Sequence, residues 1–207
     1  MAKRNTALDQ PILESARKEF YEKGFEKASL KDICKNAGVT TGAVYRRYKD
    51  KEDLFSAVVQ DTYNEIKQAA QVRIQVDVSS LSDREVLEAW NIKESSLLWW
   101  FRFLYERREN FILLISRAQN TRYADFHRSW IEQMTEQTYL FYEETFKRKL
   151  TQVTLRKKDI RTLLVGYWAM LYEPFIQDYS LEDMEIHCHY IYRLLNWHEV
   201  LQLQEKE

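Results

Sequence analysis

Apolar residues recur at helical spacing along most of this chain. In the first segment, Ile12, Ala16 and Phe20 lie four residues apart, which predicts the buried face of a helix over about residues 8–23. Gly24 follows as a residue suited to a helix C-terminus. The chain therefore opens with an amphipathic helix.

Residues 29–54 predict two short helices joined by a tight turn and followed by a third helix. Ser29 and Asp32 form a variant of the capping box that opens the first of these helices. Gly38 is the residue best able to adopt the left-handed backbone at its end, and Val39 is expected to enter the core. This layout is typical of proteins that present one helix to a DNA groove.

The second short helix is expected to start after an N-cap at Thr40 and to run to about Arg47. It would bury Val44 while exposing four residues, Thr41, Ala43, Arg46 and Arg47. Asp50 is positioned to cap the next helix, which continues to about residue 70.

Beyond residue 70, the pattern predicts a linker and further helices. Residues 72–78 alternate between apolar and polar, but one isolated strand has no partner, so residues 72–81 are interpreted as a linker. Ser82 and Glu85 form a capping box for a helix that holds Trp90 and the apolar run 97–105. Further helices are expected over residues 109–118, 121–149, 156–178 and 181–204, and Ser180 and Asp183 are expected to cap the last of them.

The composition favours an all-α fold and a reducing compartment. Of 207 residues, 45% are hydrophobic, yet only four are glycine and two are proline. The glycines form neither GxGxxG nor GxxxxGK, which disfavours a nucleotide-binding enzyme. Cys34 and Cys188 lie on predicted apolar faces in separate halves. Without a signal peptide or a membrane-length apolar run, we expect a cytoplasmic protein with no membrane partner.

The motifs in residues 12–54 resemble the DNA-binding domain of the tetracycline-repressor (TetR/AcrR) family. The resemblance rests on Ala37-Gly38-Val39-Thr40, Gly42, Val44-Tyr45, Tyr48 and Lys51-Glu52-Asp53-Leu54. Arg47 and Tyr48 depart from the family pattern, which commonly has His and Phe there. The resemblance implies a helix-turn-helix domain over residues 1–50, a connecting helix to about 71, and an effector-binding and dimerisation domain over 72–207.

By position in this motif, ten residues are candidates for contact with a double-stranded DNA operator: Ser29, Thr40, Thr41, Gly42, Ala43, Tyr45, Arg46, Arg47, Tyr48 and Lys51. Arg46 is suited to guanine, and the methyl group of Ala43 to thymine. Arg47 and Lys51 would neutralise phosphates. For Tyr45 a phosphate contact is favoured, whereas for Tyr48 core packing is slightly favoured. Residues 1–60 hold 12 Lys and Arg against nine Asp and Glu, a modest basic bias that alone would describe a solvated surface.

The remainder of the chain is rich in aromatic residues. Taken singly, each ring is best explained by core packing, but together they suggest a pocket for a small apolar or aromatic effector. The candidates are Trp99, Trp100, Phe103, Trp130, Tyr139, Tyr142, Trp168, Tyr172 and Glu173. The carboxylate of Glu173 would receive a cationic or hydrogen-bonding ligand, or would simply be solvated.

The last two predicted helices carry wide apolar faces, which predict a homodimer with a four-helix interface, as the resemblance also implies. One face comprises Leu163, Leu164, Tyr167, Trp168, Leu171 and Phe175, and the other Ile191, Leu194, Leu195, Val200 and Leu201. Burial within a monomeric core is the alternative.

The sequence offers no signature of catalysis. Neither GxSxG nor HExxH occurs, and His187 and His189 diverge on a helix too far to grip one metal ion, so we expect no enzyme, no cofactor and no metal site. The favoured function is a ligand-responsive transcriptional repressor released from a palindromic operator. The alternatives are a DNA-bound protein-interaction module without an effector and, least favoured, an enzyme with a borrowed helix-turn-helix.

Overall fold

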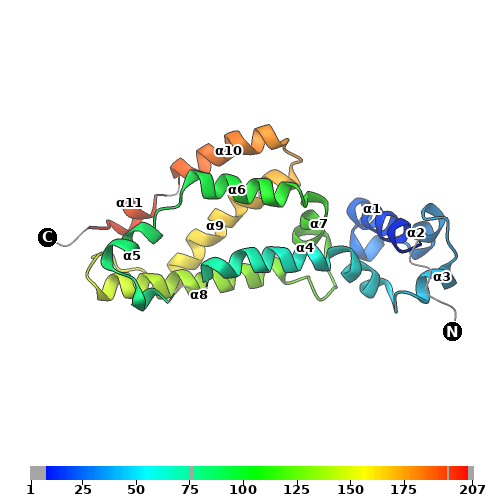
Figure 1. Ribbon diagram of the computed structural model, residues 1–207, viewed down its shortest axis with the longest axis horizontal. Coiled ribbons are helices and arrows are strands. Elements are labelled where there is room, and N and C mark those ends of the chain that lie inside the picture. Colours follow the sequence, from blue (N-terminus) through cyan, green and yellow to red (C-terminus); the bar gives the residue numbers. More distant parts are fainter. Residues whose placement is uncertain (1–7, 75–76, 195, 205–207) are drawn as a thin grey trace. The chain divides into compact units, whose positions relative to one another are not determined.

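The computed structural model describes residues 8–74, 77–194 and 196–204, and within these ranges the regular structure is helical (Figure 1). The elements are α1 (Asp9–Lys27), α2 (Leu30–Asn36), α3 (Thr41–Tyr45), α4 (Lys51–Ile74), the 3-10 turn η2 (Val78–Ser80), α5 (Asp83–Ala89), α6 (Glu94–Tyr105), α7 (Arg108–Ile112), the π-helical turn η3 (Leu113–Arg117), α8 (Phe126–Lys147), α9 (Lys157–Ile176), α10 (Leu181–Leu194) and α11 (Trp197–Leu201). The all-α fold class is confirmed.

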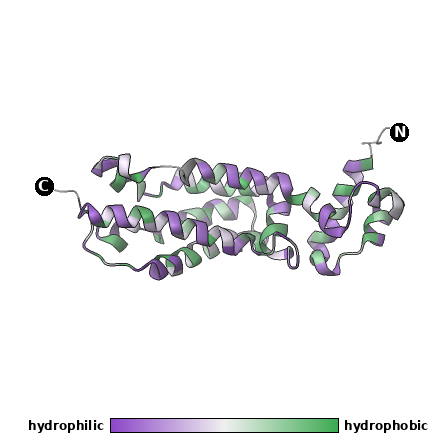
Figure 2. Ribbon diagram, turned by 90° about the horizontal axis from the view of Figure 1, so that it is seen from below, coloured by the Kyte–Doolittle hydropathy of each residue, from purple (hydrophilic) through white to green (hydrophobic). Residues whose placement is uncertain are grey.

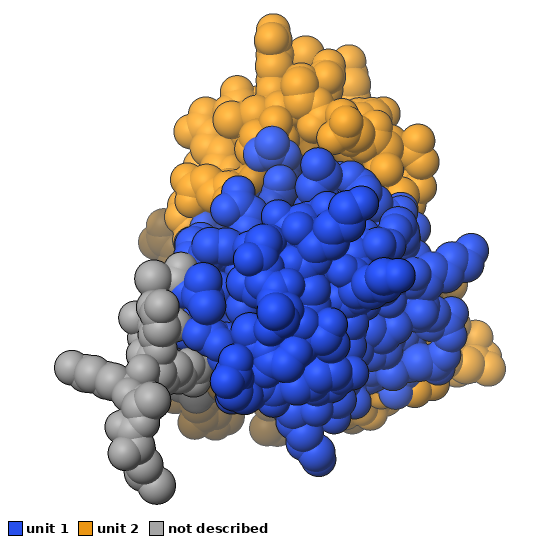
Figure 3. Space-filling model, turned by 90° about the vertical axis from the view of Figure 1, so that its right-hand side faces the viewer, with its two compact units in different colours: residues 1–69, 107–127 blue, residues 70–106, 128–207 orange. Residues whose placement is uncertain are grey.

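Contacts between residues divide the chain into two compact units, coloured separately in Figure 3. The first, which we call the head unit, comprises residues 1–69 and 107–127, and the second, the body unit, comprises residues 70–106 and 128–207. No local pattern in the sequence indicates that residues 107–127 belong to the head unit. The assignment of DNA binding to residues 1–50, and of effector binding and dimerisation to residues 72–207, stays a prediction.

The head unit has an apolar core built on α1. Ile12, Ala16 and Phe20 are completely buried, as their spacing predicts. The Phe20 ring packs edge-on against Phe55 of α4, with ring centroids 5.0 Å apart. Gly24 interrupts α1 with φ of +73°, and one further turn runs to Lys27. The helix therefore breaks where glycine predicts, but its last turn continues beyond that point.

Residues 107–127 join the head unit through polar contacts as well as packing. Asn110 donates to the hydroxyl of Thr62 (3.1 Å), and Tyr123 donates its hydroxyl to Gln60 (2.6 Å), both acceptors lying on α4. The backbone N–H of Arg122 donates to Glu52 (2.8 Å). These bonds tie a segment distant in sequence to the helix that follows α3.

The body unit contains several apolar clusters. Helices α6 and α10 lie side by side (Figure 1), and Phe101 of α6 stacks on Phe175 of α9. Another cluster gathers six buried residues from the C-cap of α5 and from α8, α9 and α11: Trp90, Tyr142, Ile160, Leu164, Trp197 and Leu201. The expected single helix through Trp90 and residues 97–105 is wrong, because α5 ends at Ala89 and α6 begins only at Glu94.

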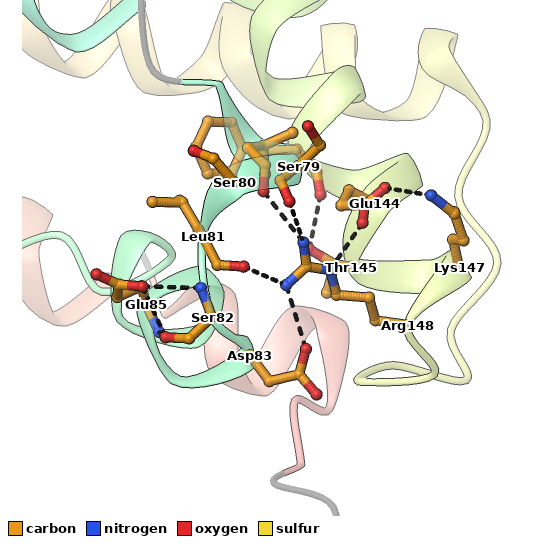
Figure 4. A network of polar contacts seen from close by, with 12 residues as sticks. Ser79, Ser80, Leu81, Ser82, Asp83, Glu85, Glu144, Thr145, Lys147 and Arg148 are labelled. Atoms are coloured by element: carbon orange, nitrogen blue, oxygen red, sulfur yellow. Dashed lines mark hydrogen bonds and ion pairs between the residues drawn. The ribbon is translucent and has the colours of Figure 1, made fainter.

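Arg148 fixes the segment after α4 to the end of α8 (Figure 4). Its Nε donates to Glu144 (2.7 Å), its Nη1 to the Leu81 carbonyl and to Asp83, and its Nη2 to the carbonyls of Val78 and Ser79. A guanidinium has five N–H donors in a fixed fork, so this geometry suits arginine and not lysine. The pKa of Glu144 is lowered chiefly by its hydrogen bond from Arg148.

Other helix ends differ from the predicted ones. Helix α4 extends to Ile74, so residues 72–74 are helical and not part of a linker, while residues 75 and 76 lie outside the described residues. Helix α8 starts at Phe126, after a series of turns, instead of at residue 121. The last predicted helix is divided into α10 and α11, because Asn196 caps a new helix by accepting from the Glu199 N–H (3.3 Å).

The capping boxes at Ser82 and Ser180 form as predicted. Ser82 accepts from the Glu85 N–H, and Ser180 from the Asp183 N–H. Figure 2 shows that many helices mix hydrophilic and hydrophobic residues along their length. Within the described ranges, no helix combines the length and apolar character required to span a bilayer.

Candidate nucleic-acid interface

Helices α2 and α3 form the helix-turn-helix that the sequence predicts. The Ser29 hydroxyl accepts from the Asp32 N–H (3.3 Å) and so caps α2. Gly38 ends the helix with φ of +67°, and the Val39 N–H closes the turn on the Cys34 carbonyl (2.9 Å). The turn therefore has the geometry of a glycine-terminated helix.

The capping box expected at Ser29 is only half formed. The Ser29 N–H donates to Glu19 of α1 (2.9 Å) instead of to Asp32. The side chain of Glu19 is only 4% exposed, and Lys23 Nζ lies 2.8 Å from the same carboxylate oxygen. A buried carboxylate of α1 therefore holds the start of α2, which leaves the Ser29 N–H engaged within the protein.

Helix α3 begins as predicted and presents a polar outer face. The Thr40 hydroxyl accepts from the Ala43 N–H (3.2 Å), and Val44 is buried as the anchor of the helix. The residues on the outer face are exposed: Thr41, Gly42, Tyr45 and Arg46. Tyr45 is 53% exposed, so its hydroxyl is accessible to a phosphate.

Two residues predicted to be exposed on α3 are not. Ala43 is buried, because it lies beside Val44 on the face that the helix turns toward the core. Arg47 has a side chain only 8% exposed, and its Nε donates to Asp9 of α1 at 2.6 Å. The predicted exposure of Ala43 and Arg47 is therefore wrong, while their roles toward DNA stay predictions.

Tyr48 and Lys51 are also engaged within the head unit. Tyr48 is buried, which agrees with core packing. Lys51 Nζ donates to the carbonyls of Glu26 (3.0 Å) and Ala28 (3.2 Å) and lies 4.8 Å from the centre of the Phe25 ring. An ammonium at the C-terminal end of α1 satisfies carbonyls that the helix leaves open and interacts favourably with the helix dipole.

Sequence reasoning missed Asp9 and Glu19. Glu19 lies at helical spacing from Ile12 and Ala16, on the buried face of α1. The sequence alone therefore indicated a carboxylate at a buried position. Asp9 offers no such signal, because its partner Arg47 lies 38 residues away. Both residues show that α1 positions the elements that carry the candidate interface.

The predicted effector residues form separate aromatic groups within the body unit. Trp99 stacks on Phe103, with Trp100 edge-on to both, and Trp130 packs edge-on against Trp168. Trp99 is exposed, whereas Trp130 is buried. These contacts account for five of the candidates by packing between rings.

The other four effector candidates are placed differently. Tyr139 packs against Tyr142, whose hydroxyl donates to the Val153 carbonyl and accepts from the Leu155 N–H. Burial, followed by the charge of Glu173, raises the pKa of Tyr172. Glu173 itself is exposed and accepts from Gln177.

A cavity of about 810 Å³ lies in the head unit, and none of its lining residues is a predicted effector residue. It is open and lined by α1, the end of α2 and Glu109 of α7. The histidines do not converge either: His187 contacts the Met170 carbonyl and His189 contacts Glu94. Among the described residues, no group of three or more His, Cys, Asp and Glu is arranged to hold a metal ion.

Comparison with known proteins agrees with this geometry. A family model described as bacterial regulatory proteins of the tetR family matches residues 12–58. The transcriptional regulator TtgR of Pseudomonas putida is 30% identical over 83 residues, 39% of this chain and 40% of that protein. AcrR of Shigella flexneri is 49% identical over 49 residues, 24% of this chain and 23% of that protein. The matches thus span less than half of these relatives.

The similarity in fold extends further than the similarity in sequence. NalD of Pseudomonas aeruginosa, the secondary repressor of the MexAB-OprM multidrug efflux pump, aligns over 93% of this chain and 98% of its own, with a TM-score of 0.59 and 20% identity. At that identity the alignment establishes the fold alone. The family match is confined to residues 12–58, the segment that contains the helix-turn-helix, and for that segment it shows similarity to the tetR family of bacterial regulatory proteins.

Proposed function

We propose that this protein is a dimeric transcriptional repressor that binds a palindromic DNA operator and is released by a small apolar or aromatic effector. The observation that carries the DNA-binding part is the outer face of α3, where Thr41, Gly42, Tyr45 and Arg46 are exposed beside the Thr40 cap. A short helix whose outer face is exposed can enter a major groove and bring the side chains of that face to base edges.

Selection of genomic fragments by the purified protein tests DNA binding. A discrete set of duplexes should be enriched, and Arg46→Ala should lower affinity for them by about tenfold or more, since one paired contact with guanine contributes ~1–3 kcal/mol. Lys158→Ala, an exposed cation of α9, serves as the control. Unchanged affinity in Arg46→Ala would remove α3 as the recognition element.

Exposed apolar residues support dimerisation through the last long helices. On α10, Ile186, Tyr190 and Leu194 follow at four-residue spacing and are 51%, 58% and 72% exposed. On α9, Leu163 and Ile176 are each 41% exposed. Burying such a stripe against a second copy would stabilise an association of the kind a palindromic operator requires.

The exposed stripe differs in part from the predicted one. Five residues of the stripes predicted from the sequence are buried within this chain: Leu164, Leu171, Phe175, Ile191 and Leu201. Leu195 lies outside the described residues.

Sedimentation velocity tests the interface: the wild type should sediment as a dimer, and a variant with Tyr190→Glu and Leu194→Glu as a monomer. A monomeric wild type would contradict the dimer.

The packing of the aromatic groups favours a second candidate function, in which the body unit binds another protein and not a small-molecule effector. Trp168, Met134 and Tyr139 pack against the buried cluster around Trp90 and Tyr142, as expected if the body unit is a filled core that recruits another protein. Thermal unfolding against a panel of apolar and aromatic compounds separates the two functions. Stabilisation together with operator release supports the effector, because only a ligand with different affinities for two states shifts their equilibrium.

A further inference from the structure

The guanidinium of Arg47 connects the start of α1 with the recognition helix α3. Its Nε donates to Asp9 Oδ1 at 2.6 Å, and its Nη1 donates to the Ala43 carbonyl at 2.9 Å. The side chains of Arg47 and Asp9 are only 8% and 21% exposed. Arg47 therefore directs its charge into the head unit and away from the outer face of α3.

The backbone at the end of α3 explains why a side chain is needed there. The Arg47 N–H donates to the Val44 carbonyl, three residues back, and the Tyr48 N–H donates to the same oxygen. The Ala43 carbonyl, four residues before Arg47, receives the guanidinium instead. At the end of α3 the backbone hydrogen bonds shift from a spacing of four residues to one of three. There the Arg47 side chain donates the hydrogen bond to the Ala43 carbonyl in place of a backbone N–H.

Helix α3 depends on tertiary contacts for its orientation. It has only five residues, and isolated helices of that length are unstable in water. Helix α1 offers a firm reference, because Ile12 and Ala16, one and two turns after Asp9, are completely buried. A contact from Asp9 to Arg47 therefore transfers the position of α1 to the end of the recognition helix.

We infer that Asp9 and Arg47 are positioning residues for DNA recognition: their ion pair sets the orientation of α3, and Arg47 acts through α3 instead of neutralising a phosphate. This inference rests on the proposed function of the α3 surface. Removing either member of a largely buried pair breaks the ion pair, so a change at Asp9 and a change at Arg47 should each weaken operator binding.

The positioning role predicts that Asp9→Asn weakens DNA binding, which is opposite to the change that the loss of a negative charge alone would cause. Removing a negative charge near DNA should strengthen binding if charge alone decides, since phosphate attraction increases with net positive charge. If the pair positions α3, Asp9→Asn should instead weaken binding to a selected operator by about tenfold, or ~1.4 kcal/mol. Affinity for unrelated duplex should not fall. Asp61→Asn, an exposed residue of α4, is the charge-matched control and should not weaken operator binding.

Arg47→Gln and the double variant Asp9→Asn/Arg47→Gln complete the cycle. The double variant should lose no more operator affinity than Arg47→Gln alone, because the ion pair with Asp9 is already absent in that single variant. The slope of log K against log salt should be unchanged in Arg47→Gln, whereas loss of a phosphate contact would reduce it by about 0.9. Lys18→Gln, an exposed cation of α1, controls for the lost positive charge.

Hydrogen exchange provides a readout without DNA. Amides of residues 43–48 should exchange faster in Asp9→Asn and Arg47→Gln than in the wild type, while those of residues 12–20 keep their protection. Stronger operator binding by Asp9→Asn, a reduced salt slope in Arg47→Gln, or unchanged exchange over residues 43–48 would overturn the inference. A wild type that binds no duplex would refute the proposed function, and the exchange experiment would still decide whether the pair holds α3.

Discussion

Glu19 provides a sharp test of how α1 positions the helix-turn-helix. Its carboxylate is almost completely buried and accepts the Ser29 N–H at 2.9 Å, immediately before α2. Glu19→Ala would leave that donor without its acceptor. A hydrogen bond to a charged group contributes about 1.5–3 kcal/mol, and one lost buried methylene adds ~0.8 kcal/mol. We therefore expect Glu19→Ala to lower the free energy of unfolding by about 2–4 kcal/mol.

Glu19→Gln separates the hydrogen bond from the charge. The amide oxygen can still accept the Ser29 N–H, and only the attraction to Lys23, whose side chain is 41% exposed, is lost. This variant should lose about 1 kcal/mol. Glu22→Ala, an exposed residue on the same helix, should change stability by less than ~0.5 kcal/mol.

Urea unfolding followed by circular dichroism measures these differences, with the slope m checked for each variant. Hydrogen exchange at residues 29–36 would show whether the loss is local to α2. The reasoning is refuted if Glu19→Ala is as stable as Glu22→Ala, since the buried carboxylate would then contribute nothing to the start of α2.

Three further predictions concern backbone, pH and thiol chemistry. Gly38→Ala should lower the free energy of unfolding, measured in urea, by about 1–2 kcal/mol, because φ at this residue is +67°. Gly42 lies in helical backbone with no atom near the added carbon, so Gly42→Ala should raise the free energy of unfolding by up to ~1 kcal/mol. Equal effects of the two changes would contradict the left-handed turn at Gly38. The hydrogen bonds from Arg156 lower the pKa of Asp159 from 3.8 to about 2, so the contribution of this carboxylate to stability is present above about pH 4 and is lost as the pH falls toward 2. The stabilities of the wild type and of Asp159→Asn should therefore converge over that range in acid unfolding curves. Parallel curves would refute this. Burial raises the pKa of the Cys188 thiol to about 11, so at pH 8 iodoacetamide should label it far more slowly in the folded protein than in urea, as mass spectrometry would show.

Local sequence signals determined much of the head unit. The Ile12, Ala16 and Phe20 spacing, the Thr40 cap and the Gly38 turn each depend on residues within a few positions of one another, and each occurs as predicted. Such features are readable because helix periodicity and capping are short-range physics. The same reasoning identified the capping boxes at Ser82 and Ser180.

Only the tertiary structure decided which polar side chains face outward. Arg46 and Arg47 are adjacent and chemically alike, yet Arg46 is exposed while Arg47 pairs with Asp9, 38 residues earlier. Glu19 takes the Ser29 N–H that a local capping box would have used, and Lys51 turns back to the end of α1. These outcomes depend on how helices distant in sequence meet. Periodicity along one helix specifies its buried face, but not the partner that a charge on its border will find.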